Sequence, residues 1–412
     1  MSRWILHVDM NNFYASVECM FNPALKDVPM VVGGDEQARH GIVLSKNDIA
    51  KNQYGIRTGE VLWQARRRCP QLVVIHPDME KYLKFSRMAM EIYGQYSDRV
   101  ESFGLDEAWI DVTHFGAKDS VQAADALRAK IRRELGITAS VGVSFNKIFA
   151  KLGSDMKKPD ATTVLREDNY RSLVWPQPVS ALLFVGPAAR QRLIRLGIET
   201  IGDLACYDKA LLHASMGKWG DILWSYANGL DSMSVAPKDA QEEIKSIGNS
   251  TTTPRDLICN EDVRLVLYRL SESVAHRLRE NGLWGRTVAI NVRDCMLCSF
   301  ERQCRVDHAT QLSGEIAQAA FSLFQRNYDW QRPVRSIGVR ITDLEKEQSV
   351  QLDFFGCEHK RERIAKLEKT SDEIRKRFGD EILYRASMMT APEITAIAPR
   401  QEYIARFSGT GV

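Results

Sequence analysis

The pattern of apolar and polar positions predicts strands and helices in the same order in two separate parts of the chain. In the first part, residues 4–10 form an apolar run and residues 139–145 alternate, as buried strands do. Apolar residues three and four positions apart predict helices over 82–96 and 120–135, and two hairpin strands lie between them near 100–111. The order strand, helix, two strands, helix, strand is that of a ferredoxin-like sheet, so we expect an α+β fold.

The second part repeats this order over residues 244–343 and is separated from the first by a different pattern. Residues 176–237 read as short helices between glycine turns, and residues 239–243 form a polar linker. A charged amphipathic helix is predicted over 358–378. Its apolar side carries Ile364, Leu367, Ile374 and Phe378. This helix could fold back on the protein, pair with a partner or do neither, and the sequence leaves the choice open.

Three carboxylates stand near the ends of predicted buried strands. Asp9 follows the run from Trp4, and Asp106 and Glu107 are adjacent inside a second apolar run. Neighbouring residues of a strand point to opposite faces, so both acids can serve one site only at a strand end or a bend, which Gly104 permits. A divalent cation with oxygen ligands would hold such acids ionised. The alternative is that Asp9 caps a helix and the other two form a polar hairpin tip.

The segments HVDMNNFYASVE and SFGLDEAWIDVT, about a hundred residues apart, resemble the palm of a Y-family, translesion DNA polymerase. Bacterial DNA polymerase IV- and V-like enzymes are the most similar members. The resemblance runs from about residue 4 to residue 343, and a further motif follows at 351–355. The two palm motifs are specific in this order, whereas either alone would be a weak signal.

This resemblance implies a right-hand polymerase with a ferredoxin-like palm (βαββαβ), small fingers, a helical thumb and a βαββαβ little finger. The implied limits are 1–10 and 76–168 for the palm, 11–75 for the fingers, 169–238 for the helix-hairpin-helix-like thumb, 239–243 for the linker, 244–343 for the DNA-binding little finger, and 344–412 for a tail with the clamp-binding motif 351–355 and the helix 358–378.

The resemblance also implies the metal and nucleotide sites. Two magnesium ions would be held by Asp9, Asp106, Glu107 and the carbonyl group of Met10. The nucleotide-binding residues would be Phe13, Tyr14, Ser45, Lys51 and Lys158. Tyr14 matches the steric gate, an aromatic ring that clashes with the 2′-hydroxyl of a ribonucleotide, and Lys158 matches the lysine that faces the triphosphate.

Two fingers positions depart from the family pattern. Asp48 and Lys51 stand where the family has a tyrosine and an arginine that hold the triphosphate. Lys51 can still neutralise phosphate as a point charge, but without the bidentate geometry of arginine. Asp48 cannot contact a triphosphate favourably, so we give it no such role.

The expected DNA contacts lie in the thumb and the little finger. Glycine turns can offer backbone N–H groups to a phosphate, and the candidates are Gly186, Gly217 and Gly220. Phe184 stands where a helix-hairpin-helix usually has its first glycine. The little-finger candidates are Arg286, Arg293, Arg302, Arg335 and Arg340. The segment Gln351, Leu352, Asp353, Phe354 and Phe355 resembles the pentapeptide that binds the bacterial sliding clamp, with a glutamine for hydrogen bonds and apolar anchors for a pocket.

Composition adds few constraints. The 412 residues include 56 Lys and Arg and 53 Asp and Glu, a net charge of only +3, so any DNA surface must come from segregated charge. No apolar run reaches the roughly 20 residues that span a bilayer, and the N-terminus lacks the apolar region of a signal peptide. We expect no membrane contact and a bacterial cytoplasmic monomer that associates with the nucleoid when it is engaged on DNA.

The eight cysteines do not predict a disulfide framework in a cytosolic protein. Cys295, Cys298, Cys304 and His308 have a spacing that could imitate a zinc knuckle. The flanking residues alternate like two strands of a hairpin with the first two cysteines near its turn, and this pattern favours the hairpin over zinc.

The expected reaction is template-directed addition of deoxynucleotides to a primer 3′ end across damaged or distorted template. Low fidelity is expected because no stretch is left over for a proofreading exonuclease. One alternative is a nucleotidyl cyclase, whose palm also places two metal-binding acids on a ferredoxin-like sheet. Another is a catalytically weak clamp- and DNA-binding accessory protein of the DNA damage response. The altered fingers residues leave that alternative open, and the presence of all three acids argues against it.

Overall fold

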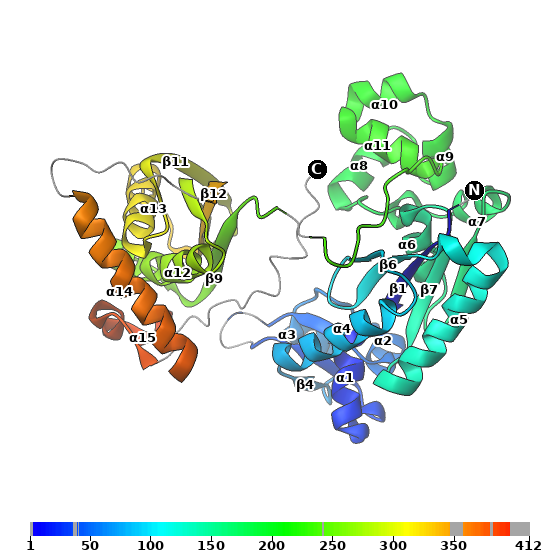
Figure 1. Cartoon of the computed structure of the whole chain (residues 1–412), viewed down its shortest axis with the longest axis horizontal. Coiled ribbons are helices and arrows are strands. Elements are labelled where there is room, and N and C mark those ends of the chain that lie inside the picture. Colours follow the sequence, from blue (N-terminus) through cyan, green and yellow to red (C-terminus); the bar gives the residue numbers. More distant parts are fainter. Residues whose placement is uncertain are drawn as a thin grey trace. The chain divides into compact units, whose positions relative to one another are not determined.

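In the computed structural model, the predicted first strand lies at the centre of a five-stranded sheet with the order β5-β6-β1-β7-β8 (Figure 1). Its strands are β1 (Ile5–Met10), β5 (Val100–Ser102), β6 (Glu107–Asp111), β7 (Ala139–Ser144) and β8 (Thr162–Leu165). β1 runs antiparallel to both neighbours, β6 and β7. The order of β5, β6, β1 and β7 is ferredoxin-like, as expected, and β8 adds a parallel strand at the edge.

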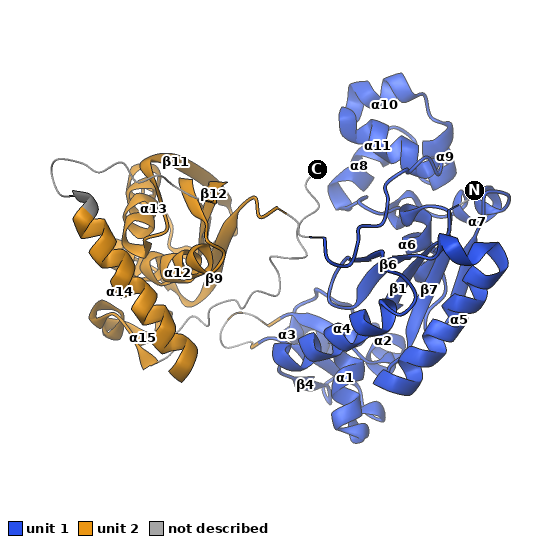
Figure 2. Ribbon diagram, in the orientation of Figure 1, with its two compact units in different colours: residues 1–34, 42–241 blue, residues 35–41, 242–412 orange. Residues whose placement is uncertain are grey.

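The structure describes residues 3–35, 39, 41–240, 243–346, 357–379 and 382–395. The chain divides into two compact units, residues 1–34 with 42–241 and residues 35–41 with 242–412 (Figure 2). The boundary after residue 241 lies inside the predicted linker 239–243. The short segment 35–41, which belongs to the predicted fingers, groups with the second unit.

Helices bury both faces of the five-stranded sheet. They are α4 (Met79–Tyr93), α5 (Gly116–Leu135), which follows η2 (Thr113–Phe115), and α6 (Lys147–Met156). α4 and α5 share one core with the sheet, whereas Ile5, Trp109 and Ala150 of α6 form a separate cluster. A Cβ atom on Gly142 would lie 1.9 Å from the carbonyl oxygen of Ala150, so glycine is what allows α6 to lie directly on β7. Burial on both faces explains why the sequence of β1 is almost wholly apolar.

The residues of the predicted fingers form a small sheet with the order β3-β2-β4. The elements are α1 (Phe13–Phe21), η1 (Pro23–Lys26), β2 (Met30–Gly33), β3 (Val43–Lys46), α2 (Asp48–Tyr54), α3 (Leu62–Arg68) and β4 (Val73–Ile75). This sheet has its own core, which includes Val31, Ile56 and Leu62. Helix α1 instead packs into the core of the large sheet through Phe13 and Val17, and so joins the two parts.

Short helices build the predicted thumb. They are α7 (Tyr170–Val174), η3 (Val179–Ala181), α8 (Pro187–Arg195), α9 (Ile201–Cys206), α10 (Lys209–Met216) and α11 (Lys218–Ala227). Leu193, Leu204, Leu212 and Leu223 meet in their common core. The same core includes Phe149 of α6, which attaches these helices to the large sheet.

The second unit repeats the order of elements but not the order of strands. Its elements are β9 (Ile247–Leu257), α12 (Asn260–Glu280), β10 (Trp284–Asp294), β11 (Ser299–Thr310), α13 (Ser313–Asn327) and β12 (Val334–Glu345). The strands pair as β11-β10-β12-β9, so the first strand lies at an edge instead of at the centre. α12 and α13 bury one face of this sheet against Val288, Ile290 and Val292.

The tail folds back on the second unit, which answers the question that the sequence leaves open. Its elements are α14 (Cys357–Phe378), η5 (Ala386–Thr390) and α15 (Pro392–Thr395). Ile394 is fully buried and belongs to the core shared with α12 and β9. The contact face of α14 is not its apolar side, because Leu367 is 66% exposed and Phe378 is 61% exposed.

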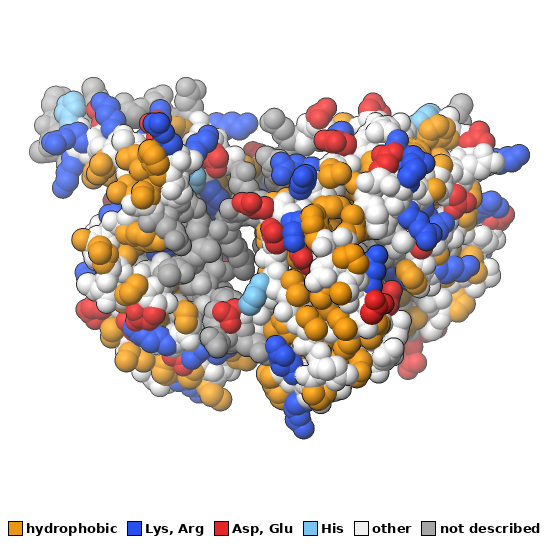
Figure 3. All heavy atoms as spheres, turned by 90° about the horizontal axis from the view of Figure 1, so that it is seen from below, with side chains coloured by type: hydrophobic (Ala, Val, Ile, Leu, Met, Phe, Trp, Pro, Cys, Tyr) orange, Lys and Arg blue, Asp and Glu red, His pale blue; other side chains and the backbone are white. Residues whose placement is uncertain are grey.

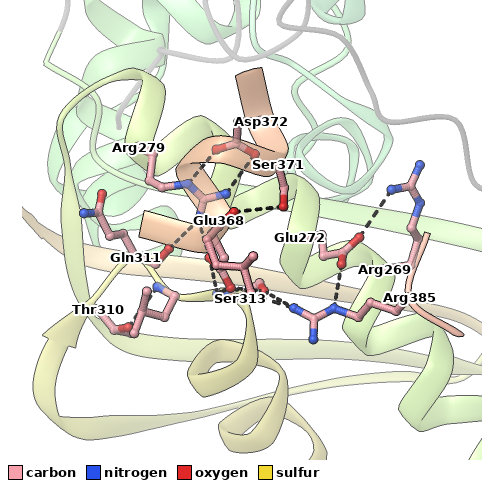
Figure 4. A network of polar contacts seen from close by, with 12 residues as sticks. Arg269, Glu272, Arg279, Thr310, Gln311, Ser313, Glu368, Ser371, Asp372 and Arg385 are labelled. Atoms are coloured by element: carbon pink, nitrogen blue, oxygen red, sulfur yellow. Dashed lines mark hydrogen bonds and ion pairs between the residues drawn. The ribbon is translucent and has the colours of Figure 1, made fainter. Parts of the chain in front are cut away.

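Charged side chains make the contact between α14 and the body of the second unit (Figure 4). Glu368 is only 8% exposed; one of its oxygens lies 2.5 Å from Nη1 of Arg279, and the other accepts the hydroxyl hydrogen bond of Ser313 at 2.5 Å. Arg279 also binds Asp372 through two hydrogen bonds of 2.7 and 3.0 Å. Both carboxylates of the helix are therefore paired with a single arginine of α12.

A second cluster lies beside the first and centres on Glu272 of α12. Arg385 donates to it at 2.7 Å, Arg375 at 3.2 Å, and Arg269 lies 3.5 Å away. Arg375 belongs to α14 and Arg385 to the segment that follows it, so this cluster fixes the far end of the docked helix. Buried pairs of this kind give little net stability but make the removal of one partner costly.

We expect Glu368→Gln to lower the free energy of opening of α14 by about 3 kcal/mol, because Arg279 is left beside a neutral partner in a buried place. Hydrogen exchange of the α14 amides in the full chain measures this free energy. Lys369→Gln changes an exposed charge on the same helix and should change it by less than about 0.5 kcal/mol. Equal effects of the two variants would show that the Glu368 pair does not hold the helix.

Candidate active site

The large sheet brings the three predicted acids to one end of its central strands. Asp9 of β1 lies opposite Glu107, the first residue of β6. Asp106 stands just before β6, and its carbonyl oxygen accepts a hydrogen bond of 3.0 Å from the backbone N–H of Met10. Because Asp106 lies at the bend of the hairpin, the alternation within a strand does not separate it from Glu107. The bend therefore lets both acids serve one site.

The acids lie close enough to perturb one another. Burial, followed by the charges of Glu107 and Asp9, raises the pKa of Asp106 to about 7. Burial and the charge of Glu107 also raise the pKa of Asp9, although Lys151 and Lys158 oppose this shift. Asp9 and Asp106 are thus costly to ionise at this place, and positive charge beside them is favourable.

Two lysines supply positive charge to this cluster. Nζ of Lys151 lies 2.9 Å from Glu107, 3.2 Å from Asp155 and 3.4 Å from Asp9. Nζ of Lys158 lies 2.7 Å from Asp9 and 2.9 Å from Asp155. Burial alone would lower the pKa of Lys151, but the surrounding acids outweigh burial and raise it.

The sequence predictions included Lys158 in this set and missed Lys151 and Asp155. The signal was present, because residues 151, 155 and 158 are spaced four and three apart and so share one face of a helix.

A buried histidine next to these acids was also missed. His7 is fully buried in β1, two residues before Asp9. Its Nδ1 lies 2.8 Å from the hydroxyl of Ser154 in α6, and its Nε2 lies 3.4 Å from Glu107. Burial, followed by the charge of Lys151, holds the pKa of His7 well below its usual value, so the ring is neutral.

The donor set suits a hard divalent cation. Three carboxylates and the backbone carbonyl of Met10 are oxygen donors, the kind that magnesium prefers. As the described side chains stand, no three Asp, Glu, His or Cys groups converge on a point that would hold a metal. Lys151 and Lys158 balance the acids instead, and a cation would take over part of that role.

The aromatic residues at the start of α1 have different surroundings. Tyr14 is partly buried and stacks on Tyr82 with ring centroids 4.3 Å apart. Burial and the charge of Asp106 raise the pKa of Tyr14 to about 12, which places its hydroxyl near the acids. Phe13 is only 3% exposed and belongs to the core, so its side chain has a packing role.

Residues of the predicted fingers make hydrogen bonds near the start of α1, and Asp48, one of the two departures from the family pattern, is among them. Asn12 has a left-handed backbone with φ of 48°, and its side chain donates to Asp48 at 2.9 Å. Ser45 accepts a hydrogen bond of 3.4 Å from the backbone N–H of Ala15 and so satisfies a group in the first turn of α1. Asp48 is therefore turned towards Asn12.

Lys46 is a further cation that the sequence analysis did not single out. Its Nζ donates to the hydroxyl of Thr58 at 2.9 Å. Partial burial, followed by the charges of Lys51 and Lys158, lowers the pKa of Lys46. The three lysines therefore influence one another across the fingers and the palm, where an anion would be stabilised.

The predicted thumb glycines do not share one environment. Gly186 precedes α8 and Gly217 joins α10 to α11 with φ of 64°, and both have open space where a Cβ would lie. Gly220 is buried, and a Cβ there would lie 2.9 Å from the carbonyl oxygen of Leu212, so its role is close helix packing. Phe184 has φ of 68°, which is the backbone conformation of the glycine that it replaces.

The predicted little-finger arginines are spread over the sheet. Arg293 and Arg340 lie on the face away from α12 and α13, whereas Arg302 lies opposite Ile290 of the covered face. Arg286 and Arg335 lie at irregularities of the strand pairing. We had expected one face to present several arginines, and the β-bulges change where two of them point.

Two of these arginines already have acidic partners. Arg340 lies 2.5 Å from Glu301, and Arg286 lies 2.8 Å from Glu345. On the face shown in Figure 3, basic and acidic side chains are interspersed over both units. The uncovered face of the β10 and β12 pair is lined by small residues, including Gly338 and Ala289, and forms a shallow hollow beside Arg340.

Three remaining expectations concern the tail, the cysteines and membranes. The clamp-binding motif 351–355 lies outside the described residues. Cys295 and Cys298 lie near the turn between β10 and β11, and the described side chains form no zinc site there. No helix in the described part of the chain is long and apolar enough to cross a membrane.

Comparison with known proteins identifies the family. Residues 8–155 match the impB/mucB/samB family, and residues 244–354 match its C-terminal domain. A DNA polymerase IV of Acetivibrio thermocellus is 50% identical over 92% of this chain and 96% of its own length. A DNA polymerase IV of Clostridium acetobutylicum is 35% identical over 95% of this chain and 100% of its own length.

A solved structure confirms the fold. A Y-family DNA polymerase chimera superposes with a TM-score of 0.73 at 24% identity, over 84% of this chain and 100% of the chimera. The expected α+β polymerase architecture is thereby confirmed. The nucleotidyl cyclase alternative is rejected, because both family matches are to the impB/mucB/samB family and the relatives are DNA polymerases. The chain belongs to the impB/mucB/samB family, the Y family of DNA polymerases.

Proposed function

We propose that this DNA-directed DNA polymerase adds deoxynucleotides to a primer 3′ end, opposite damaged or distorted template, where Asp9, Asp106 and Glu107 meet. The observation that carries the proposal is the grouping of these acids with Lys151 and Lys158 at one end of the sheet. The DNA polymerase IV relatives supply the substrate class, primer-template DNA and deoxynucleoside triphosphates.

The metal-binding residues are the three acids and the carbonyl oxygen of Met10. Two magnesium ions held there would activate the primer hydroxyl and neutralise the triphosphate. Asp106 has to be ionised to bind a cation, and its raised pKa makes the ionised form depend on positive charge close by. Lys151 and Lys158 favour the ionised form of Asp9 in the same way.

Several groups at this end of the sheet suit a triphosphate. Lys158 lies 2.7 Å from Asp9 and can balance the charge that develops on the leaving pyrophosphate. Lys51 and Lys46 add point charges where relatives have an arginine. The hydroxyl of Ser45 accepts from Ala15 and keeps its own proton for a phosphate oxygen. The ring of Tyr14, held by its stack on Tyr82, is the proposed steric gate.

The proposed DNA contacts are the turns at Gly186 and Gly217 and the uncovered sheet face with Arg293 and Arg340. All four can reach phosphates without reading bases. We propose low fidelity without proofreading, which the resemblance to translesion polymerases implies.

Recruitment by a sliding clamp is the proposed role of Gln351, Leu352, Asp353, Phe354 and Phe355. This motif lies between β12 and α14 in the chain. We propose a monomer that works in the bacterial cytoplasm and joins the nucleoid when it is engaged on DNA. The accessory-protein alternative would keep clamp and DNA binding without DNA synthesis.

Asp106→Ala is expected to lower primer extension by more than about 10³-fold, because one of the carboxylates that would hold the metal ions is lost. The rate of primer extension is measured by single-nucleotide incorporation on a defined primer-template with magnesium. Asp119→Ala removes an exposed carboxylate of α5 and should leave incorporation unchanged. Full activity of Asp106→Ala would refute the site assignment, and inactivity of the wild type with a clamp present would favour the accessory protein.

Tyr14→Ala is expected to relax sugar selection, since no ring would then clash with the 2′-hydroxyl. The ratio of deoxynucleotide to ribonucleotide kcat/KM should fall by at least about tenfold. Tyr14→Phe keeps the ring and should keep the ratio. Unchanged selection by Tyr14→Ala would assign the gate to another residue.

A variant with both Leu352→Ala and Phe354→Ala is expected to bind a bacterial sliding clamp at least about tenfold more weakly, because two apolar anchors are removed. Calorimetry on the full chain gives the dissociation constant. Ser349→Ala, outside the motif, is the control. Equal clamp affinity of the double variant and the wild type would place the contact elsewhere.

A further inference from the structure

His7 occupies an unusual place for a buried polar side chain. It lies in the middle of β1, paired with Trp109 of β6 and Gly142 of β7. Its ring meets Trp109 edge-on, with centroids 5.3 Å apart. Because strand residues two apart point the same way, His7 and Asp9 lie on the face of the sheet that α6 covers. His7 therefore lies next to Asp9 on the face of the sheet that α6 covers.

One ring nitrogen of His7 has a partner and the other does not. Nδ1 lies 2.8 Å from the hydroxyl of Ser154. Nε2 is fully buried and has no hydrogen-bond partner among the described residues, yet it lies 3.4 Å from Oε2 of Glu107. A buried unpaired nitrogen is destabilising, and an apolar side chain would fill the same place without that cost. Packing alone therefore does not explain a histidine here.

We propose that His7 is a positioning residue for Glu107: its Nε2 lies 3.4 Å from the carboxylate, without a formed hydrogen bond in this structure, and Ser154 holds the ring in place. The proposal rests on the metal-binding role proposed above for Glu107. It goes further by naming the residue that sets how this carboxylate is held.

The tautomer of the ring depends on the two acceptors that surround Ser154. In this structure the hydroxyl of Ser154 donates to the carbonyl oxygen of Lys151 at 2.8 Å, and the proposal requires that its single proton go instead to Nδ1 of His7, also at 2.8 Å. Donation to Nδ1 places the ring proton on Nε2, where it faces the carboxylate of Glu107. The opposite choice would direct a bare lone pair at a carboxylate oxygen in a buried place, which is repulsive.

A neutral donor suits this position better than another cation would. Oε2 of Glu107 already has the ammonium of Lys151 at 2.9 Å. A neutral imidazole orients the carboxylate without adding charge that would oppose a divalent cation. The distance of 3.4 Å exceeds the usual 2.9–3.0 Å of an N–H···O bond, so the proposed contact requires Glu107 to move towards the ring. Polar groups that orient a ligand in this way typically change metal affinity or activity by about 10–100-fold.

The experiment compares His7→Leu with His7→Gln, whose amide N–H can take the place of Nε2–H. Binding of Mn²⁺ is measured by electron paramagnetic resonance on the full chain, with a dideoxy-terminated primer-template and the next correct deoxynucleotide, so that no turnover occurs. We expect His7→Leu to weaken Mn²⁺ binding by about 10–100-fold and His7→Gln by less than about threefold. In primer extension, kcat should fall for His7→Leu while KM for the deoxynucleotide stays nearly constant.

A double-mutant cycle separates positioning from packing. In a Glu107→Ala background, His7→Leu should have less than about a twofold further effect on Mn²⁺ binding, because the carboxylate on which it acts is gone. An effect as large as in the wild-type background would overturn the proposal and assign His7 a packing role. The same conclusion would follow if His7→Gln and His7→Leu were equally impaired.

Ser154→Ala keeps the proposal testable if His7→Leu does not fold. It leaves the ring in place but removes the group that sets its tautomer, so Mn²⁺ binding should weaken by at least about threefold. Unchanged binding in this variant would contradict the proposal. If Glu107→Ala itself binds Mn²⁺ like the wild type, the metal role of Glu107 fails and this inference fails with it. If Glu107→Ala is impaired and the His7 effect is additive, only this inference fails.

Discussion

Repulsion among the carboxylates of Asp9, Asp106 and Glu107 is the constraint on which the rest of the first unit depends. Two strands and a hairpin bend hold these acids together, and burial makes Asp9 and Asp106 hard to ionise there. The fold meets this constraint by laying α6 directly on the sheet, so that Lys151 reaches the acids. The close approach requires Gly142, because any side chain there would clash with the helix backbone.

Acidic and basic side chains also lie close together in the predicted fingers. The family resemblance implies a tyrosine and an arginine at two fingers positions where this chain has Asp48 and Lys51. The structure separates their effects: Asp48 is bound to Asn12, and Lys51 lies near enough to Lys46 to affect its pKa. Positive charge is thus kept while the planar, bidentate geometry of arginine is lost, which favours neutralisation of phosphate over precise orientation.

The second unit uses charge differently. Its tail helix docks through buried carboxylates and arginines, while the apolar Leu367 and Phe378 remain exposed. These ion pairs fix the position of the helix, because Glu368 and Asp372 have to meet the same guanidinium of Arg279. The described part of the tail, residues 357–379 and 382–395, therefore belongs to the fold of this unit.

The sequence by itself determined the order of strands and helices in both units, the three acids and the family, because periodicity and contiguous motifs are local properties. It could not reveal that Gly220 serves packing, that Phe184 takes a glycine conformation, or that the second sheet has its first strand at an edge. The pairing of His7 with Glu107, the meeting of Lys151 with the acids and the charged face on which α14 docks were decided only by the tertiary structure. Each joins residues far apart in the chain, and their distance and burial exist only once the sheets and helices have packed.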